Sequence, residues 1–74
     1  MKAGDRVRFR DGSRAWRSRS LDAAARGRVV DLYRVPPLGE IKADVRFDSM
    51  TAPERGISVD DLEVLKDAEP PVRR

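Results

Sequence analysis

The sequence predicts an all-β fold in which five short strands close into one small, partly open barrel. The first observation is the strict alternation of apolar and polar side chains in residues 41–48, IKADVRFD, which indicates a strand with one buried face. The second is that four other segments carry β-strand patterns. The third is that a flat sheet of these strands would leave its apolar face bare. A sheet that closes on itself buries that face and removes exposed edges.

The first strand is predicted at residues 5–10, DRVRFR, where Val7 and Phe9 point to one face and arginines to the other. Residues 11–27 show no strand alternation and are expected to form a long first loop. Within this loop, residues 20–26 carry the start and stop signals of a possible one-turn helix, because a serine could cap its start and a glycine follows its end.

The second strand is predicted at residues 27–35, GRVVDLYRV, which are rich in β-branched side chains. Val30 and Leu32 are expected to share the buried face, with Val29 on the opposite one. Two prolines follow, and prolines cannot donate to a central ladder, so the strand should stop near Arg34. The strand at IKADVRFD then follows as its antiparallel partner.

The segment GISVDDLEVL, residues 56–65, allows two interpretations. Ser58 and Asp61 have the spacing of a capping box, which would open a helix whose apolar face extends to Ala68. In the alternative, a short strand is followed by one tight turn at Asp60–Asp61 and by a last short strand. We favour the alternative, because every other predicted element is a strand and a lone helix would leave the sheet unclosed.

These predictions give one domain at residues 1–65 and a disordered tail at residues 66–74, KDAEPPVRR, which is polar and has little to bury. Apolar side chains from all five strands form the expected core. Its members are Val7, Phe9, Val30, Leu32, Ile41, Ala43, Val45, Phe47, Ile57, Val59, Leu62 and Val64.

The strands resemble a known superfamily. The segments GDRVRF, GRVVDL, ADVRFD and DDLEVL, in that order, are similar to the strand sequence of small SH3-like barrels over residues 4–65. The layout resembles KOW-type barrels of ribosomal and transcription proteins, and also the small peripheral subunit of photosystem I. The resemblance implies a binding module and brings no catalytic residues with it.

The composition argues against several classes of function. The chain has neither cysteine nor histidine, so disulfides, thiolate metal sites and the usual zinc ligand sets cannot form. A nucleophilic triad lacks its usual base, and the glycines are too scattered to build a phosphate loop. The acidic pair Asp60–Asp61 is better explained as turn and cap chemistry than as an acid–base pair. We therefore expect no enzyme activity, no metal, no cofactor and no small-molecule substrate.

The predicted location is cytoplasmic, without a membrane partner. No apolar run approaches the roughly 20 residues needed to span a bilayer, and the first residues lack the apolar core of a signal peptide. The absence of cysteine fits a reducing compartment.

The candidate binding site is the segment RAWRSRS in the first loop. Three arginines flank the only tryptophan of the chain, and such a group suits either a protein interface or a nucleic acid. A third interpretation makes the tryptophan a lid over one end of the barrel and leaves the arginines solvated. The candidate residues are Arg14, Trp16, Arg17 and Arg19.

Charge distribution helps to rank the possible partners. The net charge is +3, with ten basic and four acidic residues in 1–34 but six basic and nine acidic residues in 35–74. The acidic second half argues against a general polyanion binder. We therefore expect a monomeric accessory module that binds a larger protein. The alternative is a KOW-like module that binds RNA or DNA through the arginine–tryptophan loop.

Overall fold

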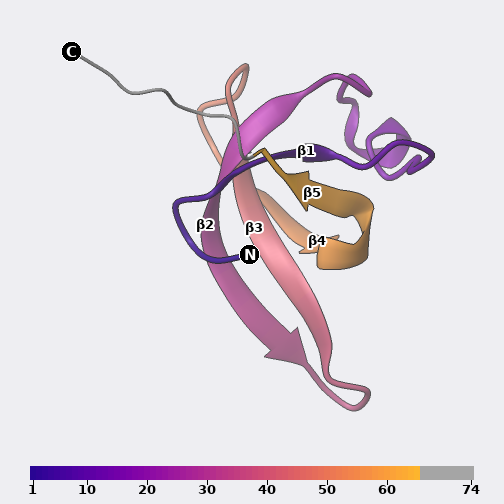
Figure 1. The fold of residues 1–74 in the computed structure, drawn as a ribbon, viewed down its shortest axis with the longest axis vertical. Coiled ribbons are helices and arrows are strands. Elements are labelled where there is room, and N and C mark those ends of the chain that lie inside the picture. Colours follow the sequence, from indigo (N-terminus) through magenta and orange to yellow (C-terminus); the bar gives the residue numbers. More distant parts are fainter. Residues whose placement is uncertain (66–74) are drawn as a thin grey trace.

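In the computed structural model, which describes residues 1–65, the chain forms one antiparallel sheet of five strands (Figure 1). The all-β prediction is therefore confirmed, while the expected disordered tail at residues 66–74 lies outside the described residues. Two single-turn 3-10 helices interrupt the strands. The elements are β1 (Arg6–Phe9), η1 (Arg17–Arg19), β2 (Arg26–Val35), β3 (Glu40–Phe47), β4 (Glu54–Ser58), η2 (Val59–Asp61) and β5 (Leu62–Val64).

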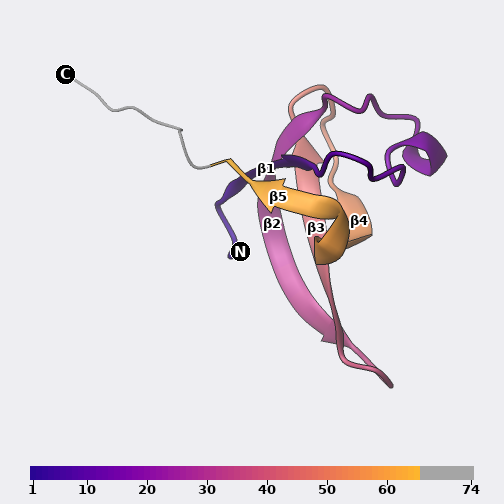
Figure 2. The same ribbon diagram turned by 45° about the vertical axis from the view of Figure 1, so that its right-hand side comes forward.

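The strands lie in the order β4-β3-β2-β1-β5, with the long strand β2 at the centre. The edge strands β4 and β5 are separated along the chain by η2 alone, so the sheet curls back toward itself (Figure 2). The β2–β3 hairpin extends beyond the other strands, and its tip carries Leu38, whose side chain is 85% exposed (Figure 1). The first loop lies at the opposite end of the molecule from this tip.

The core lies inside the curl of the sheet and receives side chains from all five strands. The rings of Phe9 and Phe47 stack at its centre, with 5.3 Å between their centroids. Leu32, Val59 and Val64, expected in the core, pack against it from partly buried positions. The expected core position of Ile41 is wrong, because Ile41 is only partly buried and belongs to neither group. The buried members are Val7, Phe9, Val29, Ala43, Val45, Phe47, Ile57 and Leu62.

The prediction that Val30 is buried is wrong, and a β-bulge explains the error. The register pairs Val29 with Val45 and then Asp31 with Asp44, so Val30 is an extra residue on β2. A bulge shifts the alternation by one position. Val29 therefore faces the core, whereas the side chain of Val30 is 49% exposed.

The prediction of a helical turn at residues 20–26 is also wrong in its position. The turn η1 lies earlier in the loop, at Arg17–Arg19, and Ser20 ends it in a left-handed conformation with φ of 59°. The serine expected to start a helix therefore terminates one. Its backbone N–H closes the turn on the carbonyl of Arg17.

The favoured interpretation of residues 56–65 is confirmed. The last strand, β5, follows directly after η2, so no helix begins there. The side chain of Ser58 accepts a hydrogen bond from the backbone N–H of Asp60 at 3.3 Å, and this caps the turn. The sequence signature was correct as a cap, but it opens one turn instead of a helix. Its proposed extension to Ala68 falls outside the described residues.

A pair of substitutions on β3 tests the direction of its side chains. Phe47→Ala removes half of the central aromatic stack and should cost about 2–5 kcal/mol of unfolding free energy, measured by urea denaturation. Arg46→Ala changes an exposed neighbour and should cost less than about 1 kcal/mol. Equal losses for the two variants would show that the assigned faces of β3 are incorrect.

Candidate functional site

Arg19, one of the four candidate binding residues, joins the first loop to the edge strand β4. Its guanidinium group forms an ion pair with Glu54 at 3.0 Å and donates to the backbone carbonyls of Arg55 and Gly56 at 2.9 and 3.3 Å. Carbonyls on an edge strand are otherwise available to another chain, so Arg19 also protects this edge. Arg19 is therefore a structural clamp, and replacing it would disturb the loop itself.

Trp16 lies between the core and the solvent. Its half-buried ring packs against the core cluster, and its indole Nε1–H donates to the carbonyl of Ser13 at 2.9 Å. The guanidinium carbon of Arg17 lies 5.9 Å from the ring centroid, within range of a cation–π contact. Trp16 therefore packs against the core while part of its surface stays accessible to solvent.

The loop is anchored at its start as well. The hydroxyl of Ser13 donates to the carboxylate of Asp61 at 3.2 Å, and the backbone N–H of Arg10 donates to the Asp61 carbonyl at 2.8 Å. With Arg19 bound to β4 further along, the long loop is held at both ends. Asp61 serves this anchor and Asp60 serves the Ser58 cap, so the interpretation of the acidic pair as turn chemistry is confirmed.

Of the candidate residues, Arg14 and Arg17 remain available at the surface. Both side chains are exposed, and neither donates a side-chain hydrogen bond within residues 1–65. They lie one to two positions from Trp16, at the end of the molecule formed by the first loop (Figure 1). The structure therefore places Arg17 against Trp16, leaves Arg14 exposed two positions earlier in the loop, and gives Arg19 a structural role.

A second charged surface was not identified by sequence reasoning. The outward side of β1, β2 and β3 carries two adjacent rows of arginines, in register across the strands. We call this surface the arginine face; its members are Arg6, Arg8, Arg26, Arg28 and Arg46. The next outward pair along β2 and β3 is Asp31 and Asp44, which limits the basic area on that side. Strand alternation places each arginine outward, but only the register shows that they converge.

Asp48 borders the arginine face, where its backbone N–H donates to the carbonyl of Arg26 at 2.9 Å. Arg6 donates to both of its carboxylate oxygens, at 2.8 and 2.9 Å. This hydrogen bonding lowers the pKa of Asp48 below its usual value, and the charges of Arg28 and Arg46 lower the pKa further. Three arginines therefore act on one carboxylate. Because the side chain of Asp48 is 61% exposed, solvent screens these interactions and their contribution to stability is small.

Asp44 organises the outward side of the other half of the sheet. One of its carboxylate oxygens accepts hydrogen bonds from the Tyr33 hydroxyl at 2.9 Å and from the Gly56 backbone N–H at 3.1 Å. Gly56 belongs to an irregularity in the β3–β4 register and has a φ of +72°, a conformation that favours glycine. Asp44 thus ties β2, β3 and β4 together, and its carboxylate has a structural role.

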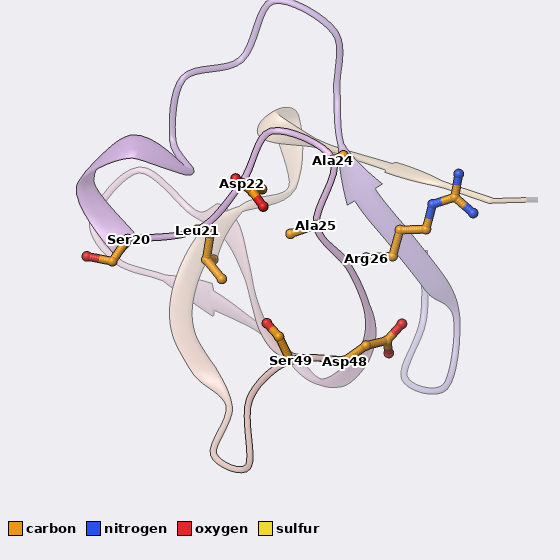
Figure 3. Close-up of a pocket in the computed structure, with 8 residues that line it drawn as sticks. All are labelled: Ser20, Leu21, Asp22, Ala24, Ala25, Arg26, Asp48 and Ser49. Atoms are coloured by element: carbon orange, nitrogen blue, oxygen red, sulfur yellow. The ribbon is translucent and has the colours of Figure 1, made fainter.

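A shallow hollow of about 370 Å³ opens between the end of the first loop and the β3–β4 connection (Figure 3). Its base is apolar, with Leu21 and Ala25 turned inward, while Asp48 and Ser49 form the opposite wall. Arg26 lies at its rim with the guanidinium group turned away from the hollow (Figure 3).

Residues 1–65 contain no group of three or more histidine, cysteine, aspartate or glutamate side chains that could hold a metal ion. Nor does the described part of the chain contain a helix long and apolar enough to span a membrane. No family model, curated protein or solved structure matches this chain.

The single tyrosine of the chain provides a direct test of the Asp44 network. The hydrogen bond to Asp44 raises the pKa of Tyr33 above its usual value, because it favours the protonated phenol. The resulting stabilisation is fully present below about pH 10, the unfolded-state pKa, and is lost as the pH rises through the folded-state pKa. Absorbance at 295 nm should follow this titration.

Asp44→Ala should return the pKa of Tyr33 toward about 10. Asp31→Ala is the matched control, since it removes the carboxylate opposite Asp44 without touching the hydroxyl. An unchanged titration in the Asp44 variant would contradict the assigned hydrogen bond.

Proposed function

We propose that this chain is a non-enzymatic binding module that docks onto a larger protein through the Trp16 end of its first loop. The observation that carries the proposal is the fixed, half-buried tryptophan with a basic rim. Its indole N–H is bound to Ser13, Arg17 lies over its ring, and Arg14 is exposed two positions earlier in the same loop. Tryptophan and arginine are the residue types most enriched where binding energy is concentrated in protein interfaces.

Preorganisation of the loop supports this proposal. Ordering a flexible loop on binding costs free energy, whereas a loop already held in place does not incur that cost again. The clamp of Arg19 on β4 and the contact of Ser13 with Asp61 hold the loop at both ends. The solvent-facing part of Trp16 can therefore enter a partner's pocket without a large rearrangement.

The SH3-like layout is part of the same proposal. It is supported by the antiparallel order β4-β3-β2-β1-β5, by the long loop after β1, and by the single 3-10 turn before β5. A cytoplasmic location and a monomeric state complete the proposal. The absence of cysteine supports the location, because disulfides are features of oxidising compartments.

The test compares partner capture by two variants of the full chain. Arg14→Ser/Arg17→Ser removes the basic rim and should reduce the capture of a specific protein from native lysate about tenfold or more, as quantified by mass spectrometry. The fold should persist, because neither side chain donates a hydrogen bond within residues 1–65. With the purified partner, the emission of Trp16 should shift and acrylamide quenching should fall.

Arg34→Ser/Arg55→Ser removes the same charge from exposed positions on β2 and β4 and should leave capture unchanged. The proposal is wrong if both double variants capture the same proteins as the original chain. It is equally wrong if the emission and quenching of Trp16 do not respond to the captured partner.

A further inference from the structure

Arginines stand directly opposite one another across three neighbouring strands. The register pairs Arg6 with Arg28 on β1 and β2, and Arg28 with Arg46 on β2 and β3. Two residues further along β1, on the same face, a second row pairs Arg8 with Arg26. Because neighbouring strands lie about 4.8 Å apart, the five guanidinium groups arise from an area roughly 10 Å across. The arginine face is thus a compact source of positive charge.

The charges on this face do not cancel. Three carboxylates face its five arginines. Asp48 is bound by Arg6 and also feels the charges of Arg28 and Arg46. Arg8 pairs with both Glu63, at 2.6 Å, and Asp11, at 3.4 Å. Three of the five arginines of this face make no ion pair within residues 1–65; these are Arg26, Arg28 and Arg46. Like charges directly opposite each other destabilise a sheet. Arg28 donates to the carbonyl of Gly4 at 2.7 Å, but the face keeps more positive than negative charges, so an external anion is a natural counterpart.

The chemistry of the face distinguishes between classes of anionic partner. The two rows contain no aromatic or aliphatic side chain, whereas the centre of a protein interface is depleted in charge and enriched in aromatics. A single strand of nucleic acid would need aromatic side chains on which its bases stack. A duplex presents a regular array of phosphates outside its bases, and the planar guanidinium fork fits a phosphate with two hydrogen bonds.

We infer that the arginine face binds the phosphate backbone of a double-stranded nucleic acid, without reading its sequence. This surface is separate from the Trp16 end of the first loop, so the inference goes beyond the proposed protein partner. The contacts would come mainly from Arg26, Arg28 and Arg46, the arginines of this face that form no ion pair within residues 1–65. A module with both surfaces could hold a protein against a nucleic acid.

The experiment measures binding of the full chain to a fluorescein-labelled 20-base-pair DNA duplex by anisotropy, between 50 and 200 mM KCl. We expect a dissociation constant in the micromolar range at 50 mM salt. The plot of log K against log salt concentration should have a slope of about −2 to −3, as two or three phosphate contacts predict.

Arg26→Gln/Arg46→Gln should weaken binding about tenfold at 50 mM salt and make the slope shallower by about two. Neither side chain donates a hydrogen bond within residues 1–65, so the fold should persist, and circular dichroism checks this. Arg34→Gln/Arg55→Gln is the matched control for net charge and should bind within about threefold of the original chain.

Three results would overturn the inference. The first is no binding of the duplex at 50 mM salt. The second is equal weakening by the two double variants, which would indicate a general charge effect. The third is competition by poly-glutamate as effective as that by unlabelled duplex, which would assign the face to an acidic protein segment. Arg14→Gln/Arg17→Gln should leave duplex affinity within threefold, so the outcome is independent of the loop.

Discussion

The absence of a side chain at Gly27 is the constraint on which the rest of the fold depends. Gly27 lies on the inward side of β2, in the row between Val7 on β1 and Phe47 on β3. A Cβ atom at this position would lie 2.6 Å from the carbonyl oxygen of Arg46 and 2.8 Å from the Cα of Phe47. These distances are closer than real contacts, so the curl of β3 over β2 requires glycine. The same close approach lets the rings of Phe9 and Phe47 meet across the strand between them.

The bulge at Val30 shows why strand alternation could be used for most of the sheet but not for β2. Alternation assumes that successive residues of a strand face opposite sides of the sheet. This holds for Phe9 on β1 and Val45 on β3, which are buried as expected. In β2 both Val29 and Val30 are apolar, so the local sequence carries no sign of which one is extra. Only the pairing with β3 decides this, and pairing depends on residues about fifteen positions away.

The two candidate sites also differ in how far the sequence alone could predict them. The sequence could predict Arg14, Trp16 and Arg17 because they lie close together in the chain. It could not show that Arg19 binds β4 and so has a structural role. The arginine face draws its members from three strands and becomes a surface only through their register. Strand alternation predicted that each arginine points outward, but not that the arginines of three strands lie side by side. Arg46 comes from the acidic half of the chain, so counting charges by halves could not place it beside the arginines of β1 and β2.

Gly27→Ala, followed by urea denaturation, tests the central claim most directly. We predict a loss of at least about 2 kcal/mol of unfolding free energy, a large share of the roughly 4–11 kcal/mol typical of a domain of this length, because β3 cannot retreat without separating the aromatic stack. Val30→Ala on the same strand should cost less than about 1 kcal/mol, since its side chain is exposed and unpaired in the bulge. A Gly27→Ala protein with the stability of the original chain would contradict the account, since β2 and β3 could then not approach as closely as described.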